Sequence, residues 1–180
     1  MRVLVPLADG CEELEAVTVI DLLRRAGIEV VCAGLQPGPV RCSRGVVLVP
    51  DMTLDAALAQ DYAMVVLPGG MPGAAHLKAD PRILDVLKRM AADGKYTAAI
   101  CAAPMVLSEA GLLKGKAATS YPGALDGQPD IRLSTDSVVR DGTVLTSRGP
   151  GTAMDFALAL IETLLGEDTR RQVEAPLMRP

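Results

Sequence analysis

Short apolar segments alternate along the chain with longer segments whose apolar residues recur every three or four positions. Short apolar runs are typical of buried strands in a parallel sheet, and the longer periodic segments are typical of helices. The pattern predicts strands at 3–7, 28–33, 64–67 and 97–100. It predicts helices at 12–26, 81–92 and 105–110, and a last long helix that follows 149–151 and ends near 165. Asp80 is the predicted N-cap of the helix at 81–92.

This alternation indicates an α/β fold with a mostly parallel sheet that helices cover on both faces. The first strand, helix and strand imply a parallel pair joined by a right-handed crossover. Ligands of such sheets bind beyond the carboxyl ends of the strands. The turns at 9–15, 68–73 and 101–104 each follow a predicted strand, so the three turns can meet in one crevice.

Weaker signals lie between these elements. Residues 40–42 and 46–49 predict two short strands, as a hairpin or as an excursion from the main sheet. Asp141-Gly142 is a strong signal for a two-residue hairpin turn between flanking strands. The remaining predicted elements are a short helix at 54–59 capped by Thr53, a strand at 117–120 and one more helical turn at 168–173.

Composition narrows the possible functions. The length of 180 residues suggests a single domain, 1–180. The composition, with 49% hydrophobic and 22% charged residues, is typical of a globular protein. The net charge of −4 and the absence of Trp give no basis for binding nucleic acid or an anionic membrane. No apolar run reaches membrane-spanning length and no signal peptide is recognisable, so we expect a cytoplasmic protein.

Four cysteines occur, Cys11, Cys32, Cys42 and Cys101, and none forms a CxxC pair. With His76 as the single histidine, a zinc site is not expected, and no metal is predicted. A disulfide framework is not expected either, because the chain is long and shows no secretory signal. The thiols should be free, and the question is which of them is reactive.

Cys101 lies where an apolar run ends and a helical pattern begins at Pro104. Small residues, including Ala102, surround it and relieve the crowding of a tight strand-to-helix turn. This is the pattern of a nucleophile elbow with sulfur in place of oxygen, and the helix N-terminus favours a thiolate. The alternative is that Cys101 is a small buried hydrophobic residue.

The helix at 12–26 begins with three carboxylates. Acidic residues there complement the helix dipole, which is sufficient reason for their presence. Glu12 and Glu15 also continue an apolar stripe formed by Val19 and Leu22, so either carboxyl can be partly buried near the strand ends. Burial raises the pKa of a carboxyl, and a protonated carboxyl can donate a hydrogen bond to a thiolate.

The glycine-rich segment 67–73 lacks the lysine and the spacing of a phosphate-binding loop. It is either a flexible turn or a place where the backbone N–H of Gly70 pairs with that of Ala102 as an oxyanion hole. His76 follows this loop and is expected to be a surface residue. Without a histidine base beside the thiol, a peptidase is disfavoured.

The chain resembles the ThiJ/PfpI superfamily, within it the branch of the Parkinsonism-associated deglycase and its bacterial relatives. The likeness covers nearly the whole length, with segments in the right order at 10–15, 24–27, 42–44, 67–70, 99–102, 146–152 and 175–177. The resemblance implies a flavodoxin-like three-layer α/β/α sandwich that forms a homodimer.

By the same motifs, Cys101 is similar to the family's reactive cysteine, and Glu15 to the glutamate whose protonated carboxyl hydrogen-bonds it. Gly70 and Ala102 match the backbone donors. The resemblance places four further residues at the substrate pocket: Gly69 in the glycine-rich loop, Arg25 and Arg44 in an anion-binding patch near the dimer interface, and Tyr121 where the animal proteins have a histidine before a proline.

The resemblance implies a cofactor-independent glyoxalase or deglycase that acts on small reactive aldehydes or on glycated side chains. Cys101 would form a hemithioacetal and Glu15 would transfer the proton. The alternative is a redox sensor or oxidative-stress chaperone that works by oxidation of Cys101 to sulfinic acid. A peptidase or amidotransferase-like hydrolase is the least favoured function, because these enzymes need a histidine beside the cysteine. Tyr121 stands where the animal proteins have a histidine, and Ala102 stands where the peptidase-like branch has the histidine of a Cys-His dipeptide.

Overall fold

The computed structural model describes residues 1–179. A seven-stranded sheet runs through its centre in the order β10-β11-β7-β6-β1-β2-β5. All neighbouring strands are parallel except β10 and β11, which are antiparallel. The strands are β1 (Arg2–Leu7), β2 (Glu29–Gly34), β5 (Met52–Thr53), β6 (Met64–Leu67), β7 (Tyr96–Ile100), β10 (Val138–Asp141) and β11 (Val144–Ser147).

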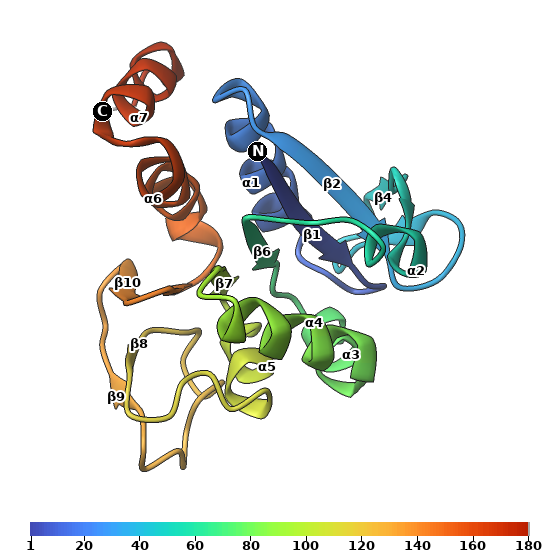
Figure 1. The fold of residues 1–180 in the computed structure, drawn as a ribbon, viewed down its shortest axis with the longest axis vertical. Helices are drawn as coiled ribbons and strands as arrows, with labels where there is room; N and C mark the ends of the chain where they lie inside the picture. The colour runs from blue at the N-terminus through green and yellow to red at the C-terminus, as the bar shows by residue number, and fades with distance from the viewer. Residues whose placement is uncertain (180) are drawn as a thin grey trace.

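Helices cover both faces of this sheet (Figure 1). One face carries α1 (Glu13–Arg25), α6 (Ala153–Leu165) and α7 (Glu167–Glu174), with α1 and α7 both in contact with α6. The other carries α3 (Gly73–Ala79), α4 (Pro81–Ala92) and α5 (Pro104–Glu109), which contact one another. The predicted α/β fold with a mostly parallel sheet is confirmed.

The central strands are buried along nearly their whole length, because helices exclude water from both faces. This explains why the sequences of these strands are continuous apolar runs. Short elements complete the chain: α2 (Leu54–Ala57), a hairpin of β3 (Val40–Arg41) and β4 (Val47–Leu48), a parallel pair of β8 (Ala117–Ala118) and β9 (Arg132–Leu133), η1 (Pro150–Thr152) and η2 (Ala175–Leu177).

Two predicted details differ from the structure. The predicted strand at 117–120 is shorter and pairs with β9 outside the main sheet. The hairpin turn is displaced by one residue, since Asp141 pairs with Val144 and leaves Gly142 and Thr143 in the turn. Asp141 stays in the strand because its carboxylate accepts hydrogen bonds from the Ala117 N–H and from basic side chains, and Gly142 takes a positive φ of 66°.

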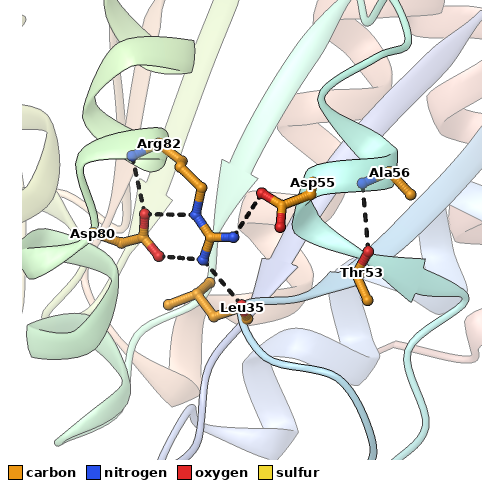
Figure 2. A network of polar contacts seen from close by, with 6 residues as sticks. All are labelled: Leu35, Thr53, Asp55, Ala56, Asp80 and Arg82. Atoms are coloured by element: carbon orange, nitrogen blue, oxygen red, sulfur yellow. Dashed lines mark hydrogen bonds and ion pairs between the residues drawn. The ribbon is translucent and has the colours of Figure 1, made fainter.

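A polar network fastens the edge of the sheet to its helices (Figure 2). The Arg82 guanidinium on α4 donates to Asp80 at 2.6 Å, to Asp55 on α2 at 2.8 Å and to the Leu35 carbonyl at 3.0 Å. Asp80 also caps α4, and Thr53 caps α2, as the sequence predicts. The Arg82 guanidinium holds the pKa of Asp80 below its usual value.

None of the helices within residues 1–179 combines the length and the apolar character that crossing a membrane requires.

Candidate functional site

Cys101 directly follows β7 and precedes α5, which has Pro104 as its first residue. Its backbone has a positive φ of 63°, a conformation that a non-glycine residue adopts only at a cost. The Cys101 N–H donates to the Ser147 carbonyl at 3.0 Å, which fixes the turn to β11. The predicted tight strand-to-helix turn is therefore present, and 8% of Cys101 is exposed.

Glu15 lies in the first turn of α1 and is fully buried. Its Oε2 accepts a hydrogen bond from the Gly69 N–H at 2.8 Å. Burial raises the pKa of this carboxyl to about 7, while the hydrogen bonds with Gly69 and with the Cys101 thiol act in the opposite direction. Its other oxygen, Oε1, is buried and has no hydrogen-bond partner within residues 1–179.

Gly69 and Gly70 bring the backbone of the loop after β6 against these two side chains. A Cβ at Gly69 would lie 2.6 Å from the Cys101 Cβ and 2.8 Å from Glu15 Oε2, closer than atoms can approach. Gly70 has a φ of +84°, and a Cβ there would lie 2.6 Å from the Gly10 carbonyl oxygen. Glycine is needed at both positions because the loop packs so closely on the site.

The Cys101 sulfur experiences opposing influences. Burial raises its pKa to about 12, and the negative charge of Glu15 acts in the same direction. The backbone N–H groups of Gly70 and Ala102 hydrogen-bond the sulfur and lower its pKa. Protonation of Glu15 removes the unfavourable charge and turns the carboxyl into a donor. The chemistry of this pair therefore depends on which group holds the proton.

The three turns at the carboxyl ends of the strands meet here, as the sequence suggests. The Glu12 N–H, at the start of α1, donates to the Gly69 carbonyl at 3.0 Å. The loop with Gly70 then contacts the turn that carries Cys101. Glu12 itself points elsewhere, since its carboxylate accepts from the Ser43 hydroxyl at 2.7 Å. The structure thus brings Glu15, rather than Glu12, to the sulfur.

Tyr121 lies against the same turn through its backbone, whose N–H donates to the Cys101 carbonyl at 2.8 Å. Its side chain is 53% exposed and borders two hollows of about 190 and 220 Å³, both also lined by Pro122 and Arg148. Its role in a substrate pocket stays a prediction.

The two arginines lie at opposite ends of α1. Arg44 is exposed on the β3–β4 loop, and its backbone N–H donates to the Glu13 carboxylate at 3.0 Å. Arg25 is exposed and paired with Asp21 at 2.7 Å. It is ten residues beyond Glu15, about 15 Å along the helix. Within one chain, only Arg44 lies near the end of α1 that carries Glu15. The anion-binding role of both arginines stays a prediction.

His76 is exposed on α3, and its Nδ1 lies 2.9 Å from the Asp9 carbonyl oxygen. It borders a cavity of about 460 Å³ between α3 and the ends of β1 and β2. That cavity is larger than the hollows beside Tyr121, but Cys101 does not line it. The perturbed carboxyl that lines the larger cavity, Asp80, is taken up by its ion pair with Arg82. A thiol and a carboxyl with raised pKa values meet at Cys101, so we assign the chemistry there rather than to the larger cavity.

Glu13 is a buried carboxylate, and its structural role is not evident from the sequence. It accepts hydrogen bonds from the N–H groups of Arg44 and Val46 and from the Ser43 hydroxyl, and these bonds lower its pKa although burial opposes them. Glu13 thereby fastens the β3–β4 loop to the start of α1. Its only sequence signal, an acidic residue in a first helical turn, is explained equally well by the helix dipole.

Over the part of the chain that the structure describes, no three His, Cys, Asp or Glu side chains are grouped to hold a metal ion. The arrangement instead offers a thiol, a carboxyl that titrates near neutrality and two backbone donors. This set can add a sulfur to an electrophilic carbon, stabilise the resulting oxyanion and move a proton.

Comparison with known proteins agrees with this geometry. "Parkinson disease protein 7 homolog" of Danio rerio is 44% identical over 98% of this chain and 96% of its own length. "Glutathione-independent glyoxalase DJR-1.2" of Caenorhabditis elegans is 35% identical over 97% of this chain and 94% of its own. The crystal structure of Drosophila melanogaster DJ-1beta is similar with a TM-score of 0.95 at 41% identity, covering 99% of this chain and 98% of that one. Residues 1–163 match the DJ-1/PfpI family, and the chain belongs to that family.

Proposed function

We propose that this protein is a cysteine-dependent, glutathione-independent glyoxalase and deglycase that acts on methylglyoxal, glyoxal or early glycation adducts. The observation that carries the proposal is the buried Glu15 carboxyl, with a pKa of about 7, beside the Cys101 thiol on a strained turn. A similar protein named as a glutathione-independent glyoxalase supports the reaction class.

In the first step the Cys101 sulfur attacks the aldehyde carbon of methylglyoxal. A carbon–sulfur bond forms, the aldehyde oxygen takes up the thiol proton, and the product is a hemithioacetal. The N–H groups of Gly70 and Ala102 already face the sulfur, so they are close to the oxygen that becomes negative during the attack.

In the second step the Glu15 carboxylate removes the proton from the carbon that bears sulfur and returns it to the neighbouring carbon, while the hydroxyl proton of the hemithioacetal passes to the former ketone oxygen. The product is a thioester of lactate, which water hydrolyses to release lactate and the free thiol. A pKa near neutrality suits this task, because the same group must both accept and give a proton. On an early adduct the Cys101 sulfur attacks the former aldehyde carbon, and the bond from that carbon to the Cys sulfur or to the Arg or Lys nitrogen breaks. The freed side chain takes up the thiol proton, and the same hemithioacetal is left on Cys101.

The test is direct measurement of D-lactate formed from methylglyoxal by the purified protein without added glutathione or metal. The proposal predicts steady production well above that of buffer alone. Absence of lactate would overturn it. Loss of methylglyoxal alone does not count as activity, because protein side chains also consume this aldehyde.

A second candidate function is redox sensing, or a stress chaperone controlled by the same sulfur. Cys101 is the most exposed of the four thiols, at 8%, and its carboxyl and backbone donors are suited to hold a sulfinate. Intact mass after mild peroxide treatment tests this. A selective gain of two oxygen atoms at Cys101 supports the sensor, whereas uniform oxidation of all four cysteines contradicts it.

We further propose that the protein forms a homodimer through α1 and the β3–β4 hairpin. Glu13 joins these two segments, and together they expose five large apolar side chains: Leu14, Val17, Val46, Val47 and Val49. Such a surface favours burial against a second copy. Sedimentation analysis tests the dimer: a monomer at micromolar concentration would contradict it. Arg44 lies on this surface, in accord with its predicted place near the interface.

A further inference from the structure

Two cysteines that the proposed chemistry does not use lie in direct contact. The Sγ atoms of Cys11 and Cys42 are 3.6 Å apart, although 31 residues separate them in sequence. Cys11, at the entry to α1, is fully buried, and Cys42, between β3 and the hairpin loop, is 4% exposed. At this distance the two sulfur atoms are in van der Waals contact.

The backbones on both sides of the pair are held together. The Gly10 N–H donates to the Arg41 carbonyl at 2.8 Å, and the Ser43 N–H donates to the Cys11 carbonyl at 2.8 Å. A disulfide has a sulfur–sulfur distance of about 2.05 Å, so the two sulfurs need to approach by only about 1.6 Å. Rotation of the two side chains and small backbone adjustments between fixed neighbours suffice.

The other two cysteines have different surroundings. The Cys32 sulfur lies 3.8 Å from the Arg24 guanidinium, and Cys101 lies beside Glu15. Within residues 1–179, Cys11 and Cys42 are thus the two thiols placed to react with each other. Since Cys42 is the more exposed, an oxidant reaches it first.

We propose that Cys11 and Cys42 are a redox-active dithiol that a hydroperoxide converts into a reversible disulfide, which fastens the β3–β4 hairpin to the start of α1. The hydroperoxide first transfers one oxygen atom to the Cys42 sulfur, giving a sulfenic acid and an alcohol, or water from hydrogen peroxide. The Cys11 sulfur then attacks this sulfur, the new sulfur–sulfur bond forms, and water leaves. Two thiols lose two electrons and two protons in total, and the hydroperoxide is reduced.

The bond stabilises the entry to α1, four residues before Glu15. It also joins the two segments that form the proposed dimer face. We expect the oxidised protein to have a higher midpoint of thermal unfolding, by about 5 °C or more, because the cross-link restricts the unfolded chain.

The experiment uses the Cys101→Ser protein, because this substitution removes the competing thiol. The protein is exposed to a small excess of hydrogen peroxide. Free thiols are then alkylated after denaturation, and the digest is analysed by mass spectrometry. The expected result is a peptide linked through Cys11 and Cys42 that dithiothreitol releases, with Cys32 alkylated as the matched buried control. The linked peptide should be absent from the same protein with Cys42→Ser.

The peroxide dose is one that oxidises Cys101 in the parent chain. The proposal would be overturned if Cys11 and Cys42 were recovered at this dose as separately alkylated thiols. A separate sulfinic acid at Cys42, or an unchanged unfolding midpoint of protein shown to be linked, would also overturn it. The Cys101→Ser protein carries both thiols, so the test does not depend on folding of the variant that also has Cys42→Ser. Lactate formation is not part of the readout, which keeps this inference separate from the proposed activity.

Discussion

The molecule holds two buried sulfur sites that differ in what surrounds them. At Cys101, a carboxyl that titrates near neutrality and two backbone N–H groups face the sulfur. At Cys11 and Cys42, each sulfur faces chiefly the other, and burial raises the pKa of both thiols. Burial alone therefore does not define a reactive cysteine: the difference lies in groups that can exchange a proton with the sulfur or stabilise its charge.

The comparison predicts different chemistry for the two sites. Cys101 is equipped to attack carbon, because Glu15 can take up and return a proton beside it. The carboxylates near the other pair, Glu12 and Glu13, accept hydrogen bonds from the β3–β4 loop, and burial together with their charge raises the pKa of Cys42. That pair is therefore suited to bond formation between the two thiols. The substitutions below test this division, beginning with the largest expected effect.

Glu15→Gln removes the proton-transferring carboxyl while it keeps nearly the same shape. We expect kcat for lactate formation from methylglyoxal to fall by roughly 10² to 10⁴-fold, the usual contribution of general acid–base catalysis. Glu12→Gln is the matched control, because Glu12 lies in the same helical turn but bonds Ser43 instead. Equal losses in both variants would show that helix charge, and not the Glu15 proton, matters.

The raised pKa of Glu15 makes stability depend on pH. Its carboxyl titrates at 4.5 in the unfolded chain and at about 7 in the fold, so between these values the folded state binds more protons. The stability of the parent should fall by about 3 kcal/mol relative to Glu15→Gln as pH rises from 4.5 to 8. Denaturant titrations at both pH values measure this difference, and a constant difference would contradict the raised pKa.

Gly69→Ala introduces a Cβ that collides with Cys101 and Glu15 together. We expect a loss of about 1–3 kcal/mol in unfolding free energy, as for other overpacked sites, with reduced lactate formation. Gly151→Ala is the control, because a Cβ there meets no atom within 4 Å. Parent-like activity and stability of Gly69→Ala would mean that the loop is not packed against the site as described.

Cys42→Ala gives the smallest effect. It removes one buried sulfur atom, so we expect a loss of about 1 kcal/mol in stability. Lactate formation should stay within about twofold of the parent, because Cys42 does not contact Cys101 or Glu15 in the structure. A loss of kcat comparable to that of Glu15→Gln would show that the two sulfur sites act as one.

Much of the fold follows from local pattern. The apolar runs at 64–67 and 97–100 coincide with the buried strands β6 and β7, and Thr53 and Asp80 cap helices where predicted. The turn of the last hairpin was predicted one residue too early. The carboxylate of Asp141 bonds groups far away in sequence, and no local pattern records such contacts.

The site was predictable only in part, for the same reason. Helical spacing places Glu12 and Glu15 on one stripe and does not choose between them. The family resemblance points to Glu15, and the packing of the loop at Gly69 gives the physical reason. The burial of Glu13 and the contact of Cys11 with Cys42 depend on the β3–β4 hairpin folding back onto α1. That approach of distant segments leaves no periodic signal in the sequence.

The central claim is that the Cys101 sulfur carries the reaction. Its most direct test is D-lactate formation from methylglyoxal by the parent chain and by Cys101→Ser, with folding of the variant verified by its thermal unfolding. The account predicts steady lactate production by the parent and only the background of buffer for the variant. Equal lactate production by the folded Cys101→Ser protein would contradict it.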